Sequence, residues 1–371
     1  MRVALVHDWL TGMRGGEKAL ERLCEIFPHA ELFTLVHVKG TVSPLIEDRP
    51  IHTAFTQHLP RVAQAYRYYL PLFPSAIERF DFRGFDLVVS CSHCVAKSVV
   101  VPENVPHICY CLTPMRYAWD QFDAYFGPQK VGRVASAALR PVMNRLSRWD
   151  QATAGRPNRY LAISQYVARR IGLYYNRQSS VVYPPVDTDY FTPGGDRPGA
   201  AFVIVSALVP YKRLELAIDA AHAAHLPLDI VGDGPDRASL ESLAARGPGV
   251  RLLGRLDDAA VREHLRTAAA VLLPGEEDFG IVPVEAQACG RPVVALGRGG
   301  ALDTVIDGET GVLVGETTVE SLEAGLRRAA ATRWQPARIR AHAETFSRRR
   351  FVAAIEQVVD DTMRAPAGTR W

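Results

Sequence analysis

Residues 201–231 read AFVIVSALVPYKRLELAIDAAHAAHLPLDIV, and the fold class can be inferred from this stretch. An apolar run at 201–206 is followed by a helix-like stretch at 213–224, and a second apolar run follows at 228–231. Strand, helix and strand in this order are typical of a βαβ unit with parallel strands. The stretch therefore predicts an α/β fold built around a parallel sheet.

The same alternation continues beyond this stretch. Further strands are expected at 250–253, 270–273, 292–295 and 311–314, and helices at 236–245, 257–268 and 281–289. These elements predict a doubly wound, Rossmann-like domain, in which ligands bind at the carboxyl ends of the strands.

The first half of the chain carries a second set of such runs. Strands are expected at 3–6, 30–35, 87–90, 107–110 and 160–163, and a helix is expected at 16–27. Proline and glycine are dense at 183–199, as in a linker. We therefore expect two facing Rossmann-like domains, at 1–183 and 184–345, with a ligand cleft between them. A C-terminal helix at 346–371 is expected to pack back on the first domain.

Composition argues against several classes of protein. The 371 residues are 48% hydrophobic, which is ample for two cores, and the formal net charge is +3. This charge is too small to favour nucleic acid as a partner. No run of about 18 apolar residues is present, and the N-terminus reads as a strand rather than a signal peptide. The expected compartment is the cytoplasm.

Four of the cysteines are spaced like pairs of zinc ligands. Cys91 and Cys94 are followed by Cys109 and Cys111. Both pairs lie in or just after apolar, strand-like runs, whereas zinc pairs usually lie on tight turns. Buried reduced thiols are therefore the favoured interpretation, and no metal site is expected.

An acidic, glycine-containing loop lies between an expected strand and helix in residues 274–294, PGEEDFGIVPVEAQACGRPVV. The N-terminus of the helix presents free N–H groups and a partial positive charge, which suit a phosphate. Glu277 lies in the loop and Glu285 lies one to two turns into the helix, and carboxylates accept hydrogen bonds from sugar and ribose hydroxyls. The alternative is that Glu277 caps the helix and that Glu285 is solvated.

This segment resembles the Glu-x7-Glu signature of the family 4 retaining glycosyltransferases, which have the GT-B fold of two Rossmann-like domains. The positions that match are Glu277, Phe279, Gly280, Glu285, Ala286, Ala288, Gly290, Pro292 and Val293, while Asp278 replaces a common glycine. The resemblance implies that Glu285 binds the ribose of a nucleotide sugar and that Glu277 binds the sugar. Backbone N–H groups of Phe279, Gly280 and Ile281 would orient the sugar and the diphosphate. It also implies transfer with retention, without a metal or other cofactor.

A second segment, VSALVPYKR at 205–213, resembles the family's diphosphate-binding loop. Lys212 would neutralise the leaving diphosphate, and the alternative is a solvated lysine at a helix start. The family usually has an arginine where Ala207 stands, so Arg213 or another arginine is expected to substitute. Residues 252–256 resemble the segment that meets the nucleotide base, which makes Arg255 a candidate for donor binding.

Glycine turns complete the resemblance. Gly15 and Gly16 follow the first strand and open a helix, and glycine allows close approach of the backbone to a ligand. In the family this loop faces the donor diphosphate, although a Gly-Gly pair is equally consistent with an ordinary turn. Residues 297–301 resemble the family's Gly-Gly turn beside the donor site.

Residues 86–97 and 110–120 resemble a narrower group, the bacterial transferases of O-antigen and exopolysaccharide assembly, many of which are mannosyltransferases. This resemblance implies transfer of mannose from GDP-mannose to a lipid-linked or saccharide acceptor, with UDP-hexoses as the second choice of donor. Arg116, Tyr117 and Trp119 are candidates for acceptor binding. His93 is a candidate catalytic or binding residue, and the alternative is a hydrogen-bonded histidine at a strand end.

Leu112 departs from the family pattern, because members often carry a histidine there that helps to hold the donor sugar. Leucine can neither donate a hydrogen bond nor transfer a proton. We hypothesise that the sugar has a less polar edge here or that His93 takes over this contact. If Leu112→His left donor preference and rate unchanged, the hypothesis would fail.

Two arginine-rich stretches bear on membrane contact, at 61–73 and 131–149. Basic amphipathic helices lie on anionic membranes, so peripheral attachment to the inner face of the cell membrane is one interpretation. A solvated arginine face over an ordinary core is slightly favoured.

Three other functions stay open. One is a UDP-hexose-dependent transferase acting on a small molecule. Another is a nucleotide-sugar epimerase or a phosphorylase of the same fold. The third is a non-catalytic protein that binds sugar nucleotides.

Overall fold

The structure is a computed structural model that describes residues 1–194 and 198–371. It divides into two compact units, Met1–Pro185 with Phe351–Trp371 and Val186–Arg350. The expected linker at 183–199 includes residues 195–197, which lie outside the described residues. Each unit is built on one sheet.

The first unit contains a parallel sheet with the strand order β3-β2-β1-β4-β5-β6-β7 in the part of the chain that is described. Its strands are β1 (Val3–His7), β2 (Glu31–Thr34), β3 (Ile51–Thr53), β4 (Leu87–Ser92), β5 (His107–Cys111), β6 (Arg159–Ala162) and β7 (Ser180–Val181). Every residue of β1, β4 and β5 is buried. This pattern is typical of the centre of a parallel sheet that is covered on both faces.

Helices and short helical turns surround this sheet. They are α1 (Gly15–Ile26), α2 (Pro44–Glu47), α3 (Val62–Ala65), α4 (Phe73–Ile77), α5 (Arg116–Trp119), α6 (Phe122–Phe126), α7 (Pro128–Val131), α8 (Arg133–Ala152) and α9 (Gln165–Tyr175). The C-terminal helix α17 (Arg348–Arg364) enters this unit at Phe351, whose ring packs edge-on against Tyr110 with the centroids 5.6 Å apart. The arginine-rich stretch at 61–73 contributes Tyr66, Leu70 and Phe73 to the core.

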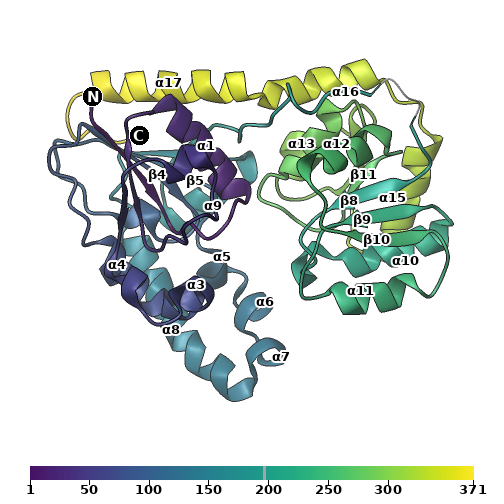
Figure 1. Cartoon of the computed structure of the whole chain (residues 1–371), viewed down its shortest axis with the longest axis horizontal. Coiled ribbons are helices and arrows are strands. Elements are labelled where there is room, and N and C mark those ends of the chain that lie inside the picture. Colours follow the sequence, from purple (N-terminus) through teal and green to yellow (C-terminus); the bar gives the residue numbers. More distant parts are fainter. Residues whose placement is uncertain (195–197) are drawn as a thin grey trace. The chain divides into compact units, whose positions relative to one another are not determined.

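The second unit contains a parallel sheet with the order β10-β9-β8-β11-β12-β13 among the described residues. Its strands are β8 (Phe202–Val205), β9 (Leu228–Val231), β10 (Val250–Gly254), β11 (Val271–Leu273), β12 (Val293–Leu296) and β13 (Gly311–Val314). Its helices are α10 (Leu214–Ala224), α11 (Arg237–Ala244), α12 (Asp258–Thr267), α13 (Ile281–Ala288), α14 (Ala301–Thr304), α15 (Val319–Ala331) and α16 (Pro336–Ala343). Figure 1 shows α10 and α11 on one face of this sheet and α12 and α13 on the other.

The expected fold class, α/β with two parallel sheets, is confirmed. The expected helix at 346–371 forms over Arg348–Arg364. Strands β3 and β7 were not expected, because three and two residues respectively are too few for a periodic pattern.

The strand order reverses once in each sheet, between β1 and β4 in the first unit and between β8 and β11 in the second. In doubly wound sheets, the loops that follow such strands diverge to opposite faces and leave a crevice at the carboxyl end of the sheet. Ligands of doubly wound sheets bind there, so these two points are where a site is expected.

Candidate functional site

In the second unit, an ion pair joins the two loops at the point where the strand order reverses. Lys212 ends the 3-10 turn Pro210–Lys212 after β8, and Glu277 lies in the loop after β11. The Nζ atom of Lys212 contacts Oε1 of Glu277, and the two side chains are 15% and 25% exposed. Lys212 is therefore not a freely solvated lysine. Glu277 does not cap α13, because the residue at the cap position is Gly280 and no side chain bonds there.

The N-terminus of α13 opens beside this pair. Gly280 has a φ of 86°, a left-handed conformation that glycine adopts without a steric penalty. Pro283 has no N–H group, so the unpaired donors of the first turn belong to Gly280, Ile281 and Val282. Such donors at a helix N-terminus are suited to a phosphate or to the oxygen of a sugar.

The glycine turn at 297–301 packs against the acidic loop that carries Glu277. The N–H of Gly300 donates to the carbonyl oxygen of Glu277 at 2.7 Å. A Cβ atom on Gly300 would lie 2.3 Å from Cα of Phe279, so no larger residue fits without a backbone shift. The turn at 297–301 thus fixes the position of the Glu277 backbone.

The remaining donor-site candidates of this unit have different surroundings. Glu285 is only 6% exposed, which excludes the solvated alternative. Phe279 is buried and its ring packs against Phe346 with the centroids 5.6 Å apart, so its side chain belongs to the core. Arg213 forms a half-exposed ion pair with Glu215 at 3.0 Å. Arg255 follows β10 and is exposed, and Ala207 is exposed in the loop after β8.

In the first unit, Gly15 and Gly16 begin α1 directly after the loop that follows β1. A Cβ atom on Gly16 would lie 2.9 Å from Cδ1 of Leu112 and 3.6 Å from Cε1 of His7. The glycine therefore allows Leu112, which follows β5, to pack against the start of α1. Leu112 is the residue that stands where the glycosyltransferases resembled in sequence often have a histidine.

His7 is buried beneath this contact. Its Nδ1 atom lies 2.8 Å from the carbonyl oxygen of Cys91, and its Nε2 atom lies 3.8 Å from Oε1 of the buried Glu17. Burial disfavours the imidazolium, but the contacts with Cys91 and Glu17 outweigh it and raise the pKa of His7 well above its ordinary value. This pair ties the end of β1 to the first turn of α1.

His93 follows β4 and is held by Asp8, which follows β1. Its Nδ1 atom lies 3.1 Å from Oδ2 of Asp8, and the side chain of His93 is 25% exposed. The carboxylate of Asp8 is fully buried and also accepts four backbone N–H groups. These belong to His93, Cys94, Val95 and Ala96, at 2.7, 3.0, 2.6 and 2.8 Å. The loop after β4 is thus wrapped around one carboxylate.

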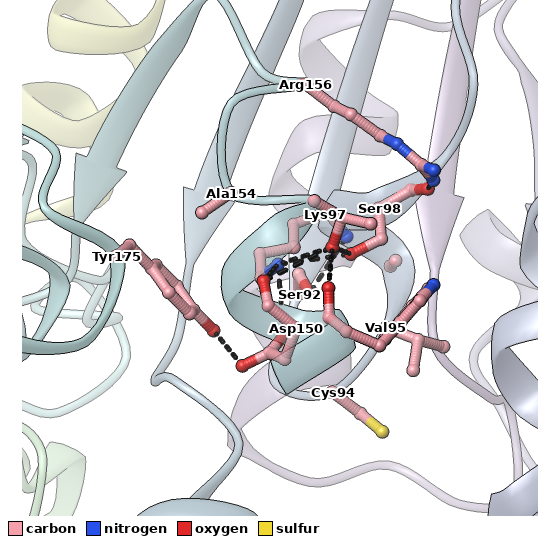
Figure 2. Close-up of polar contacts among 12 residues, drawn as sticks. Ser92, Cys94, Val95, Lys97, Ser98, Asp150, Ala154, Arg156 and Tyr175 are labelled. Carbon is pink, nitrogen blue, oxygen red and sulfur yellow. Dashed lines mark hydrogen bonds and ion pairs between the residues drawn. The ribbon is translucent and has the colours of Figure 1, made fainter. Parts of the chain in front are cut away.

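A buried polar network fixes the far end of the same loop. Figure 2 shows the side chain of Lys97 surrounded by oxygen atoms and Tyr175 bonded to Asp150. Nζ of Lys97 lies 3.0 Å from Oδ1 of Asp150, and both residues are at most 1% exposed. Oδ2 of Asp150 accepts hydrogen bonds from Trp119 Nε1 at 2.8 Å and from the hydroxyl of Tyr175 at 2.9 Å.

This network bears on the residues proposed to bind the acceptor. Trp119 uses its indole N–H for Asp150 and stacks on Tyr174, with the ring centroids 4.7 Å apart. The hydroxyl of Tyr117 lies 2.7 Å from Sγ of Cys94. Both rings are therefore tied to the unit's interior, while Arg116 is partly exposed.

Sequence reasoning missed Asp8, Lys97 and Asp150 as parts of this arrangement. The available signal was an aspartate directly after the first apolar strand, at an edge where ligands bind. All six cysteines are buried free thiols. Within residues 1–194 and 198–371, no cluster of histidine, cysteine or carboxylate side chains is arranged to hold a metal. None of the helices in these ranges is long and apolar enough to cross a membrane.

The sequence is similar to those of known glycosyltransferases. Residues 194–346 match the family described as "Glycosyl transferases group 1". A D-inositol 3-phosphate glycosyltransferase of Geodermatophilus obscurus is 31% identical over 285 residues, which cover 64% of this chain and 63% of that protein. A GDP-mannose-dependent alpha-(1-6)-phosphatidylinositol monomannoside mannosyltransferase of Mycolicibacterium smegmatis is 31% identical over 203 residues, which cover 43% of this chain and 50% of that protein. The chain thus matches between half and two thirds of the length of these relatives.

Solved structures match over nearly the whole chain. Anabaena HepE in complex with UDP aligns with a TM-score of 0.70 and 19% identity, covering 98% of this chain and 99% of that one. The fold is therefore the GT-B architecture of two Rossmann-like domains that glycosyltransferase structures display.

Proposed function

We propose that this protein is a glycosyltransferase that moves a hexose from a nucleotide-diphosphate sugar to an acceptor hydroxyl with retention of configuration. The observation that carries the proposal is the pair of Lys212 and Glu277 where the strand order reverses, beside the open N-terminus of α13. A cation, a sugar-binding carboxylate and free N–H groups are what a nucleotide-diphosphate sugar requires. The match of residues 194–346 to the glycosyltransferase family supports the same assignment.

Each group has a defined part in the proposed reaction. Lys212 would neutralise the leaving diphosphate, since an ammonium group has three donors and can bind Glu277 and a phosphate oxygen together. Glu277 would bind the hydroxyls of the transferred sugar, and Glu285 would bind the ribose. The N–H groups at the start of α13 would stabilise the charge that develops as the sugar departs. No metal or other cofactor is needed in this scheme.

For the donor we propose GDP-mannose, with UDP-hexoses as the second choice. The sequence resemblance to mannosyltransferases and the printed name of the Mycolicibacterium smegmatis relative support mannose. The complexes of HepE with UDP and UDP-glucose support the alternative. For the acceptor we propose a lipid-linked or saccharide hydroxyl, near Arg116, Tyr117 and Trp119.

Nucleotide-sugar binding and turnover test the proposal in sequence. A thermal-shift screen of GDP-mannose, UDP-glucose, UDP-N-acetylglucosamine, GDP and UDP identifies the base and the sugar, because a bound ligand raises apparent stability by mass action. Release of nucleoside diphosphate is then measured with and without acceptor, and the anomeric configuration of the product is read by NMR.

A pair of neighbouring variants serves as the matched test of the site. Glu277→Gln is expected to abolish turnover, while Glu276→Gln, which changes the exposed neighbour in the same loop, leaves it near the wild-type value. If no nucleotide sugar binds, or if binding occurs without turnover by any acceptor, a non-catalytic binding protein is the better description.

We also propose a peripheral contact of α8 with an anionic membrane surface. Met143 and Leu146 are buried on one face of this helix. Arg145 and Arg148 are exposed on the helix, and Val134 near its start is 86% exposed. A helix that exposes both basic residues and an apolar side chain suits the surface of an anionic bilayer.

Sedimentation with anionic vesicles across a salt series tests this contact, because screening weakens attraction between exposed charges. The variant Arg145→Gln/Arg148→Gln is expected to bind less than the control Arg246→Gln/Arg333→Gln, which removes exposed arginines from the second unit. Absence of salt-sensitive binding would leave α8 as an ordinary solvated helix.

A further inference from the structure

Two polar residues lie on the loops at the point where the strand order of the first sheet reverses, and neither has a part in the proposed reaction described above. Asp8 follows β1 and His93 follows β4, the two strands between which the order of the sheet reverses. Nδ1 of His93 lies 3.1 Å from Oδ2 of Asp8. Four backbone N–H groups converge on the same carboxylate, which resembles an anion-binding nest filled by the protein's own side chain. The carboxylate is therefore fixed in position.

The charge contact with Asp8 favours one tautomer of His93. A lone pair on Nδ1 would face the carboxylate oxygen 3.1 Å away and be repelled by it, whereas an N–H on Nδ1 is attracted, so the contact favours the hydrogen on Nδ1. A neutral ring then has its lone pair on Nε2, the opposite edge of the imidazole.

The ring is partly buried, and this partial burial favours the neutral form. It lowers the pKa of His93 below its ordinary value, and the nearby charges of His7 and Arg14 act in the same direction. The carboxylates of Asp8 and Glu17 oppose this effect without reversing it. The ring therefore stays neutral near pH 7, with Nε2 as an acceptor.

The surroundings of the ring leave that edge accessible. The indole of Trp9 meets the His93 ring edge-on with the centroids 4.5 Å apart, and the ring of His7 lies 5.6 Å away. A quarter of the His93 side chain is exposed. Among the described residues, no hydrogen bond to its Nε2 atom is found, and this atom is not one of the fully buried polar atoms that lack a partner. Leu112, which follows the neighbouring strand β5, offers no polar group.

We propose that Asp8 is a positioning residue that holds His93 with Nε2 as the acceptor for a hydroxyl group of a saccharide substrate. The saccharide part of this inference rests on the proposed glycosyl transfer. Orientation of an imidazole by a carboxylate on its other nitrogen is a recurring device for setting the tautomer of a functional histidine. The hydroxyl can belong to the donor sugar or to the acceptor, and the contact chemistry is the same for both.

The tautomer is measured first, on the unsubstituted full-length protein. Nitrogen-15 NMR of protein labelled at histidine distinguishes protonated from unprotonated ring nitrogens, and the resonances of His93 are those that vanish in His93→Asn. We expect a protonated Nδ1 and an unprotonated Nε2 at pH 7. A protonated Nε2 would overturn the proposal, and this result does not depend on the folding of any variant of Asp8.

Two substitutions of His93 then distinguish a residue that binds the substrate from one that only supports the loop after β4. The amide of asparagine lies near the place of Nδ1 and can keep the contact with Asp8, whereas the amide of glutamine reaches the place of Nε2. We expect His93→Asn to lower kcat/KM by about 2- to 13-fold, the range for a lost hydrogen bond between neutral groups, and His93→Gln to lose less. If His93→Asn were the more active variant, the side chain would be a structural support of the loop and the proposal would be wrong.

The same variants identify which sugar supplies the hydroxyl. Loss of affinity for the nucleotide sugar, with affinity for the free nucleoside diphosphate retained, assigns it to the donor. A raised KM for the acceptor with unchanged donor affinity assigns it to the acceptor. If the tautomer is as expected but no nucleotide sugar is turned over, the proposed glycosyl transfer fails while the positioning of His93 by Asp8 stands.

Discussion

The ammonium group of Lys212 is ion-paired with the carboxylate of Glu277, and this pair links the loop after β8 to the loop after β11. The two residues are 65 positions apart and meet because β8 and β11 are neighbours in the sheet. In the absence of donor, each charge is therefore satisfied by the other. In the proposed function, a donor diphosphate would be a second partner for Lys212.

Lys212→Gln is expected to weaken binding of nucleoside diphosphate by about 10- to 100-fold, because a hydrogen bond to a charged group contributes about 1.5–3 kcal/mol. Affinity for the nucleoside without phosphate should not change. Isothermal titration calorimetry with both ligands measures this difference. The control is Arg246→Gln, since Arg246 is an exposed arginine after α11 that is not among the donor-site candidates. Equal weakening by the two variants would mean that Lys212 has no special part in binding the diphosphate.

The close packing of Gly300 against the Glu277 loop predicts a second effect. In Gly300→Ala the new Cβ would lie 2.3 Å from Cα of Phe279, so the loop must move. Overpacking of this kind costs about 1–3 kcal/mol of stability, and the displaced Glu277 should also lose donor affinity. Urea unfolding and nucleotide-sugar titration measure the two effects. Gly315→Ala, where nothing lies within 4 Å of the new Cβ, is the control and should behave as wild type.

The sheets could be predicted from the sequence because their pattern is local. Strands such as 228–231 and 311–314 form at the residues expected, since an apolar run bounded by turns carries its own signal. The acidic loop at 274–280 could be recognised for the same reason, as all of its residues are contiguous. The roles assigned to Glu277 and Lys212 stay predictions.

The polar pairs of the first unit could not be predicted, because they join residues that are far apart in the chain. Asp8 and His93 are 85 positions apart and meet only because β1 and β4 are adjacent. Lys97 and Asp150 are 53 positions apart and lie on a short turn and a long helix. Trp119 was expected to bind the acceptor, and its indole N–H is bonded to the second of these pairs.

The buried pair of Lys97 and Asp150 predicts a large loss of stability when one partner is removed. Lys97→Met leaves the carboxylate of Asp150 buried without its cation, which costs about 3–5 kcal/mol. The free energy of unfolding from urea titration measures this loss. The control is Asp123→Asn, which breaks an ion pair to Arg140 whose side chains are 56% and 76% exposed and which should cost about 0–1 kcal/mol. A similar small loss in both variants would show that water reaches Lys97 and Asp150.

Acid should destabilise the first unit through His107, the first residue of β5. Burial and the nearby charge of Lys97 lower the pKa of His107 to about 3, and its Nε2 atom lies 2.8 Å from Oγ of Ser90. In the unfolded chain a histidine has a pKa of about 6.5, so the unfolded state binds more protons between these two values. Stability is therefore full above about pH 6.5 and is lost as the pH falls toward 3.

Between pH 7 and pH 5 this one histidine should cost the folded state about 2 kcal/mol. His107→Gln is expected to lower stability at pH 7 but to flatten the dependence on pH by about that amount, because the titrating ring is gone. Urea titrations at the two pH values give the slope for each protein. His29→Gln, which changes an exposed histidine, should keep the wild-type slope. If His107→Gln keeps that slope as well, His107 is not the group whose protonation unfolds the protein.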